Sequence, residues 1–386
     1  MKHRQPAVLI ADLAEGMTSD RRLAVRGRRL LRGVPSAPTT RPTVTVIVLT
    51  YNYGRFLGPC AESVLDQRDV DLELLIVDDA SKDDTLQVTD QLVDRDPRVT
   101  VVRNHTNRGQ LPSMNAALDQ VRTAFVVKLD ADDLLPPGSL ARSCALMQEF
   151  PQVTFCYGRP LHFAGAVPEP SELPAKSWTI WDGYGWFARR CRAGTNVISQ
   201  PEVLMRTAAV RKVGPVREDL KHTFDMHLWL QLSLIGDVGR VNGPAQGYYR
   251  VHDQSLQRTE HAGAMIDLEG RRDAFDAVFQ SEGDWLRDAE ALRDSSHRAL
   301  AATALDAACR GYDRPRSQPA PTEDLIRFAV QVYPQAPNLP EWRALDRRIA
   351  AGPKHASRKP RFILDAAARR AAEALATWRW RRSGEW

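Results

Sequence analysis

The 386-residue sequence is poor in cysteine and in long apolar runs. Its five cysteines are scattered and include no Cys-x-x-Cys pair, which argues against a disulfide framework or a zinc knuckle and predicts reduced thiols. No apolar stretch reaches the length that spans a bilayer. The short apolar run 7–10 is followed by Asp12 and Glu15, so we expect no secretory signal. The sequence therefore predicts a cytoplasmic protein.

The net charge of +5 is concentrated at the two ends of the chain. Six arginines occupy positions 21–32, and five arginines lie between positions 369 and 382, where Trp378 and Trp380 are interleaved with them. Basic ends with aromatic residues suit an anionic membrane surface, which predicts peripheral attachment to the cytoplasmic face. Nucleic acid would also attract such ends, but it explains nothing between Thr43 and His252, so no nucleic-acid partner is expected. Solvated helix faces without a partner are the plain alternative.

The chain is predicted to have three parts. Residues 1–42 form a basic arm and linker with a helix around 19–32, residues 43–255 a folded α/β domain, and residues 256–386 a helical extension. Within the middle part, apolar strand patterns alternate with helical patterns. Only short helices are expected after residue 322. In the middle part, the strands are expected at 44–49, 72–77, 99–102, 126–129 and near 238–241, and the helices at 56–67, 83–94, 113–121 and 226–235. This alternation predicts a mainly parallel sheet flanked by helices.

Polar clusters follow four of these predicted segments: Thr50-Tyr51-Asn52, Asp78-Asp79, Asn107-Arg108-Gly109 and Asp130-Ala131-Asp132-Asp133. The carboxyl ends of parallel strands meet at one edge of a sheet, where ligands gather. Carboxylates as close together as those of the last cluster repel one another unless a cation lies among them. The sequence therefore predicts a site for Mg²⁺ or Mn²⁺. The alternative is an acidic loop whose aspartate caps a helix beginning at Ser139.

These clusters, in order with 224–229 and 249–252, resemble the family 2 glycosyltransferases, whose nucleotide-sugar-binding fold is called GT-A. The resemblance covers 43–255 and implies sugar transfer, with inversion, from a nucleotide diphosphate donor to an acceptor hydroxyl. The donor it implies is a UDP-sugar, and the acceptor is a glycan or a lipid-linked molecule. The product would belong to cell-envelope glycans or other glycoconjugates.

The resemblance also assigns roles to the donor-binding residues. Asp79 would accept the uracil imide N–H, while Thr50, Tyr51 and Asn52 close over the base and ribose. Arg108 would lie near the diphosphate, because a guanidinium matches its charge and geometry. The alternative for Asp79 is a cap on the helix that begins near Asp83.

Metal binding and proton transfer complete the predicted site. Asp132 would bind the divalent cation, with Asp130 as a supporting contact and His252 approaching the metal or the diphosphate. Asp133 would share the metal or cap the next helix.

The predicted general base is Asp225, which stands four residues before Trp229 as the family pattern requires. Phe224 occupies the position where the family often has Glu, and helix capping is the alternative role for Asp225. A zinc site at His222, Asp225 and His227 is disfavoured by its spacing.

Two other functions compete with glycosyl transfer. A nucleotidyltransferase also uses paired carboxylates, but it needs a glycine-rich loop after the first strand, and 50–54 contains one glycine. A non-catalytic scaffold would not be expected to retain the candidate residues Asp79, Asp132, Asp225 and His252 together. The tryptophans Trp178, Trp181 and Trp186 either stack on an acceptor sugar or belong to the core, and the core is favoured.

Overall fold

The computed structural model describes residues 29–31, 40–169, 173–252, 263–313, 322–352, 356 and 359–383. The chain divides into two compact units. Unit 1 comprises 1–187, 198–219 and 228–252, and unit 2 comprises 188–197, 220–227 and 253–386. Two short segments from the middle of the chain thus belong to the second unit. The predicted three-part division stays a prediction.

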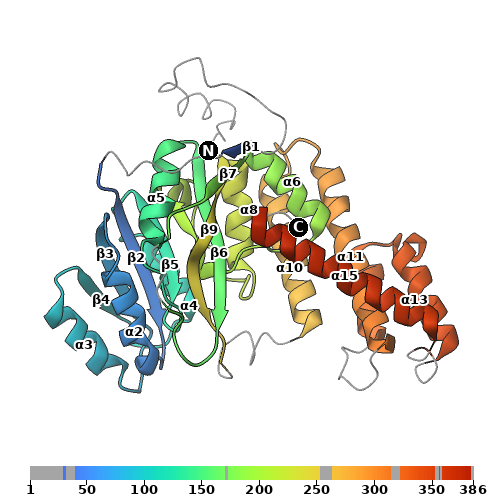
Figure 1. Cartoon of the computed structure of the whole chain (residues 1–386), viewed down its shortest axis with the longest axis horizontal. Helices are drawn as coiled ribbons and strands as arrows, with labels where there is room; N and C mark the ends of the chain where they lie inside the picture. Colours follow the sequence, from blue (N-terminus) through green and yellow to red (C-terminus); the bar gives the residue numbers. More distant parts are fainter. Residues whose placement is uncertain are drawn as a thin grey trace, which may run out of the picture. The chain divides into compact units, whose positions relative to one another are not determined.

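Unit 1 is built on a sheet that has nine strands within the described residues, in the order β1-β7-β9-β6-β8-β5-β2-β3-β4 (Figure 1). The strands are β1 (Arg29–Leu31), β2 (Thr43–Thr50), β3 (Asp71–Asp78), β4 (Val99–Arg103), β5 (Phe125–Asp130), β6 (Val153–Phe163), β7 (Ser177–Trp181), β8 (Leu204–Arg206) and β9 (Asp237–Arg250). Strands β5, β2, β3 and β4 are parallel, as are β6 and β9, while β1, β7 and β8 pair antiparallel. The predicted α/β fold with a mainly parallel sheet flanked by helices is confirmed.

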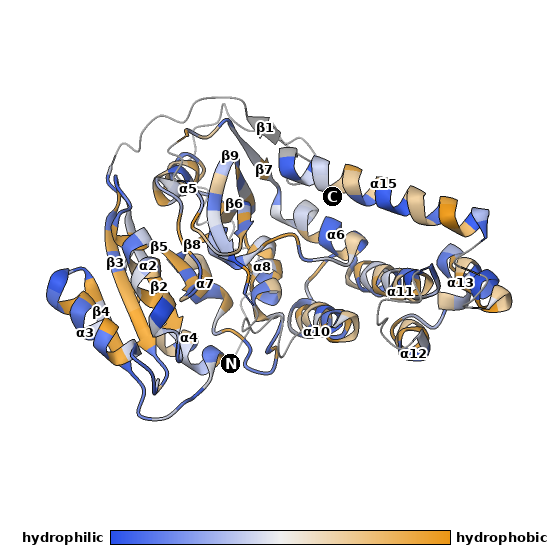
Figure 2. Ribbon diagram, turned by 60° about the horizontal axis from the view of Figure 1, so that its bottom comes forward, coloured by the Kyte–Doolittle hydropathy of each residue, from blue (hydrophilic) through white to orange (hydrophobic). Residues whose placement is uncertain are grey.

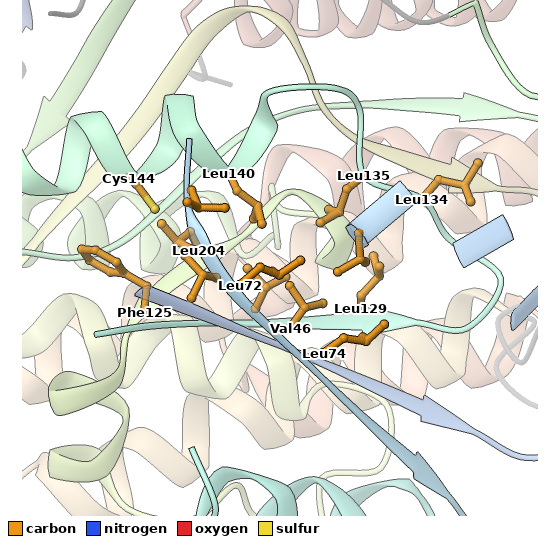
Figure 3. Close-up of a cluster of buried hydrophobic side chains, with 14 of the residues drawn as sticks. Val46, Leu72, Leu74, Phe125, Leu129, Leu134, Leu135, Leu140, Cys144 and Leu204 are labelled. Atoms are coloured by element: carbon orange, nitrogen blue, oxygen red, sulfur yellow. The ribbon is translucent and has the colours of Figure 1, made fainter. Parts of the chain in front are cut away.

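The parallel strands read as continuous apolar runs because both of their faces are covered. Side chains from β2, β3 and β5 meet in one buried cluster that includes Val46, Leu72, Leu74, Phe125 and Leu129 (Figure 3). Figure 2 shows the same apolar character along β3. The helices that begin in this unit are α2 (Gly54–Leu65), α3 (Thr85–Arg95), α4 (Gln110–Leu118), α5 (Ser139–Glu149), α6 (Gly183–Ala193) and α7 (Thr207–Val213).

Unit 2 is helical, as expected for the C-terminal part. Its helices are α10 (Ala264–Glu282), α11 (Ala289–Asp313), α12 (Thr322–Val332), α13 (Pro340–Ala351) and α15 (Pro360–Ser383), and α8 (Phe224–Leu234) begins in it. Phe275, Leu300, Leu305 and Phe328 are buried among these helices. None of the helices in the described part of the chain is long and apolar enough to cross a membrane.

Three local expectations were wrong. The helix expected around 19–32 is contradicted at Arg29–Leu31, which pair with β7 as an edge strand, and its other residues lie outside the described part. Tertiary pairing with a free strand edge satisfies backbone groups there and overrides local helix preference. Only short helices were expected after residue 322, but α15 has 24 residues. The strand expected near 238–241 continues to Arg250, because β6 pairs with it along that length.

Candidate functional site

The carboxyl ends of the parallel strands place the polar clusters of the sequence at one edge of the sheet. Thr50 is in register with Asp78 across β2 and β3, and Leu49 is in register with Asp130 across β2 and β5. Strand β4 continues the alignment, because Arg103 is in register with Asp78. The strand register confirms the predicted convergence.

Residues 130–133, which we call the acidic turn, follow β5 and are bound by residues at the end of β9. The Oδ2 atom of Asp132 lies 2.8 Å from His252 Nε2, and both side chains are largely buried. Arg250 donates from Nε to the Asp132 carbonyl (2.8 Å) and from its backbone N–H to Asp133 Oδ1 (2.9 Å). Just beyond the turn, Leu134 and Tyr248 exchange two backbone hydrogen bonds of 3.0 and 2.9 Å. The structure therefore brings together the two residues predicted to hold a metal.

The carboxylates of this turn are crowded and poorly hydrated. Burial, followed by repulsion from Asp130, raises the pKa of Asp132. Burial raises the pKa of Asp133 well above its usual range, with further increases from Asp132 and Asp130. The buried Oδ2 atom of Asp133 has no hydrogen-bond partner within the described residues. A cation would relieve each of these costs, so the residues present fit a divalent ion.

The number of protein ligands also fits such an ion. Across the described ranges there is no group of three His, Cys, Asp or Glu side chains arranged to hold a metal. His222, Asp225 and His227 form no such group within the described residues. Mg²⁺-type ions, in contrast, are commonly bound through one or two carboxylates together with the phosphates of a substrate.

A buried lysine beneath the acidic turn was not predicted. Lys128 on β5 is only 1% exposed, and its ammonium group makes an ion pair with Asp130 Oδ1. It also donates to Gln200 Oε1 at 2.7 Å. Side chains two positions apart on a strand point to the same face, so a lysine two residues before Asp130 in an apolar strand was the available signal.

Asp79 accepts four hydrogen bonds from the loop after β4. Its Oδ1 atom accepts from Asn104 Nδ2 (2.7 Å), from the Arg108 backbone N–H (2.9 Å) and from Ser113 Oγ (3.3 Å), and its Oδ2 accepts from the Gly109 N–H (2.8 Å). Asp79 therefore fixes the start of α4. The capping alternative is wrong, because Asp83 and not Asp79 bonds the first residue of α3. The contact with uracil stays a prediction, and Asn104 and Ser113 were missed.

The residues after β2 connect two neighbouring loops. Asn52 adopts a left-handed backbone conformation (φ 57°), donates its N–H to Ser81 Oγ (2.9 Å) and accepts from the Lys82 N–H (2.7 Å) at Oδ1. Thr50 is buried, and its hydroxyl has no partner within the described residues. The side chains of Tyr51 and Arg108 are exposed at this edge. Their roles toward base and diphosphate stay predictions.

Two other expectations have clear outcomes. No aspartate of the acidic turn caps α5, because that helix begins after Gly138 and Asp133 bonds Arg250 instead. The tryptophans Trp178, Trp181 and Trp186 are buried, which confirms that they belong to the core.

The predicted base, Asp225, belongs to unit 2, whereas the residues above belong to unit 1. It lies in the first turn of α8, and its Oδ1 accepts from the Met226 N–H (2.6 Å). A negative charge at this position favours the helix N-terminus. Its role as a base stays a prediction.

Comparison with known proteins agrees with this geometry. Residues 45–212 match the model of the family described as Glycosyl transferase family 2. The chain contains a family 2 glycosyltransferase domain. This domain includes the acidic turn, Asp79 and Lys128 but neither Asp225 nor His252, and its identification confirms the resemblance over 45–212.

Relatives of the glycosyltransferase domain occur in larger and smaller proteins. Chondroitin synthase of Escherichia coli is 27% identical over 202 residues, which are 52% of this chain and 28% of the relative. The chain thus spans less than a third of that protein. A glucosyltransferase of Escherichia coli, WfaP, named as acting with UDP-Glc on alpha-D-GlcNAc-diphosphoundecaprenol, is 26% identical over 218 residues, 55% of this chain and 79% of the relative.

A solved structure shares the fold of the glycosyltransferase domain. Residues 1–349 of S. aureus TarS, crystallised in complex with UDP-GlcNAc, superpose with a TM-score of 0.55 at 19% identity. The superposition covers 76% of this chain and 81% of the TarS chain. At this identity the likeness establishes the fold.

Proposed function

We propose that this protein transfers a sugar from a UDP-sugar donor to an acceptor hydroxyl, with inversion at the anomeric carbon and with a divalent cation as cofactor. The single observation that carries the proposal is the 2.8 Å contact of His252 with Asp132, which lies at the carboxyl edge of the parallel strands that match family 2. The acceptor is proposed to be a glycan or a lipid-linked glycan of the cell envelope, since WfaP is named for a diphosphoundecaprenol acceptor. UDP is proposed as the nucleotide because TarS binds UDP-GlcNAc and WfaP is named for UDP-Glc.

The residues of the acidic turn have distinct roles in this proposal. Asp132 and His252 hold the cation, which when bound supplies positive charge to the diphosphate leaving group. Asp130 contacts the ribose and is oriented by Lys128 from below. Asp133 bonds the backbone N–H of Arg250 through Oδ1, and its buried Oδ2 is available to share the cation. Asp133 thus positions the turn through β9.

The donor nucleotide is proposed to lie over the ends of β2 and β3. The buried hydroxyl of Thr50 and the exposed ring of Tyr51 are available to it, and Asn52 shapes the loop. Oδ1 of Asp79 already accepts three hydrogen bonds and Oδ2 accepts one, so we propose that Asp79 contacts uracil through Oδ2. Arg108, whose backbone N–H bonds Asp79, would contact the diphosphate through its exposed guanidinium.

Asp225 is proposed as the general base. Its carboxylate accepts the proton of the acceptor hydroxyl as that oxygen bonds to the anomeric carbon, and the bond to the diphosphate breaks with its electron pair moving to the leaving group. The support is its place in the sequence pattern, four residues before Trp229. Phe224 supplies no second carboxylate at the position where the family often has Glu.

Ligand-dependent thermal unfolding of the full chain tests the donor and the cation together. UDP-glucose, UDP-GlcNAc and GDP-mannose would each be added with Mn²⁺ or with EDTA. We expect a UDP-sugar to raise the unfolding temperature only when Mn²⁺ is present, because binding to the folded state stabilises it by about 3 kcal/mol when the ligand is at a hundred times its Kd. Stabilisation by nucleoside triphosphates but by no nucleotide sugar would favour a nucleotidyltransferase. No response to any of these ligands would contradict the proposal.

A further inference from the structure

Helix α15 has one face that packs against the other helices of unit 2 and one face that does not. The inward face includes the buried Phe362, whose ring lies 4.5 Å from the guanidinium of Arg348. Arg348 is itself buried and bonds Asp313 at 2.9 Å. Arg369 of α15 makes an ion pair with the same Asp313. These contacts fix the orientation of the helix within unit 2.

The outward face of α15 is apolar and exposed. Leu364 is 69% exposed and Trp378 is 54% exposed, and Ile363 and Leu375 are also largely exposed. Exposed alanines lie between them at helical spacing, at positions 367, 371 and 374. Residues three and four apart share one helix face, so these side chains form a continuous stripe. We call residues 363, 364, 367, 371, 374, 375 and 378 the outer stripe.

The outer stripe is bordered by positive charge. Arg361, Arg370, Arg379 and Arg381 are exposed along it. The described part of the helix has two acidic residues, and both lie beside arginines of other helices in unit 2: Asp365 is 3.4 Å from Arg348, and the exposed Glu373 is 3.5 Å from Arg310. The segregation of the charges leaves the outward face both apolar and cationic. The mixture of orange and blue along α15 is visible in Figure 2.

We propose that the outer stripe of α15 docks on an anionic phospholipid surface. An amphipathic helix with an apolar face and basic flanks lies in the interface of such a membrane. Tryptophan prefers the headgroup level, and arginine side chains can reach from an apolar contact to the phosphates. The described helices cannot span a bilayer, so α15 would lie along the surface.

A second copy of the chain is a poorer occupant of the same face. A two-fold contact is made by the same patch on both subunits, which would set the four arginines of one copy against those of the other. Anionic headgroups, in contrast, complement them. The proposal does not depend on the glycosyltransferase activity, because it concerns unit 2 alone.

Vesicle co-sedimentation of the full chain tests the membrane proposal. We expect the protein to pellet with vesicles of phosphatidylcholine mixed with phosphatidylserine, less with phosphatidylcholine alone, and less at high salt. Leu364→Glu with Leu375→Glu should lower vesicle affinity at least tenfold. Arg370→Gln should lower it about fivefold, the loss expected for one basic residue near a charged surface. Val330→Glu, at an exposed position of α12, is the matched control and should bind as the parent does.

The unfolding temperature and the donor-dependent thermal shift of each variant should equal those of the parent, which separates this test from that of the proposed function. Equal binding to neutral and anionic vesicles, or no binding by the intact chain, would overturn the proposal. So would a dimer that Leu364→Glu dissociates while vesicle binding is unchanged, since the stripe would then join two copies.

Discussion

The ammonium group of Lys128 makes an ion pair with the carboxylate of Asp130, the first aspartate of the acidic turn, from inside the sheet. The two partners differ in their access to water, because Lys128 is 1% exposed whereas the Asp130 side chain is 35% exposed. Removal of Asp130 and removal of Lys128 should therefore lower the free energy of unfolding by different amounts. Without Asp130, the ammonium group of Lys128 would stay buried beside less negative charge, whereas Asp130 without Lys128 would be partly hydrated.

This asymmetry predicts unequal stability losses. Asp130→Asn should lower the free energy of unfolding by about 3 kcal/mol, because it removes a carboxylate that is ion-paired with a buried ammonium. Lys128→Met should cost about 1 kcal/mol, and the double variant should be more stable than Asp130→Asn alone. Denaturant unfolding in a double-mutant cycle measures the coupling. The exposed pair Arg327 and Asp324 is the control, with a coupling below about 1 kcal/mol. Equal costs for both single variants would contradict the stated role of burial.

Removal of the proposed metal ligand should abolish cation-dependent donor binding. Asp132→Ala deletes a carboxylate that contacts His252, and we expect the Mn²⁺-dependent rise in unfolding temperature with a UDP-sugar to disappear. Asp90→Ala changes an exposed carboxylate on α3 and should retain that rise. A full response of Asp132→Ala to Mn²⁺ and donor would place the cation elsewhere.

Substitution of the proposed base should separate chemistry from binding. Asp225→Asn is isosteric, and we expect kcat to fall by about 10²–10⁴-fold while the donor-dependent thermal shift is unchanged. Asp225 lies in the first turn of α8, so the variant should also lose about 0.3–1 kcal/mol of stability. Glu290→Gln makes the same kind of change in the first turn of α11 and controls for this helix effect. Turnover at the parental rate would remove Asp225 from the chemistry.

The free energy of unfolding should depend on pH through the titration of Asp237, at the start of β9. Burial, and secondarily repulsion from Asp182, raises the pKa of Asp237 to about 6. The folded state therefore prefers the protonated form, so its stabilisation is complete below the unfolded pKa of 3.8 and is lost as the pH rises through about 6. At 1.36 kcal/mol per pKa unit, the loss at neutral pH is about 3 kcal/mol.

Asp237→Asn should remove this pH dependence. Its free energy of unfolding should match that of the parent near pH 4 and exceed it by up to about 3 kcal/mol at pH 7. Asp182→Asn should give a smaller gain over the same range, because it removes only the secondary cause. A difference between Asp237→Asn and the parent that is constant with pH would contradict the raised pKa.

The parts of the fold that could be predicted are those that the local sequence determines. Strands β2, β3 and β5 are apolar runs bounded by polar clusters, and the helices between them have clear periodicity. The element types, and the convergence of the polar clusters at one edge of the sheet, could therefore be predicted. Strand β8 is three residues long and exists because its backbone pairs with both β5 and β6. Strand β1 likewise depends on the free edge of β7. No local pattern marks either strand.

The candidate site likewise has contacts that the sequence predicts and contacts that it does not. Asp132 and His252 were paired through the ordered family pattern, whereas the contacts of Asp79 with Asn104 and Ser113 depend on loop conformations that residue types do not specify. The two hydrogen bonds from Arg250 to the acidic turn were missed for the same reason. They join Arg250 to Asp133 and Asp132, which precede it in the sequence by 117 and 118 positions.

The direct pairing of the acidic turn with the end of β9 has an evolutionary consequence. Leu134 and Tyr248 join the two segments through backbone groups, so the site geometry does not depend on the length of the chain between them. The cost of closing a loop rises only slowly with its length. The connection between β6 and β7, where Val167 is exposed, can therefore gain or lose residues while the carboxylates stay in place.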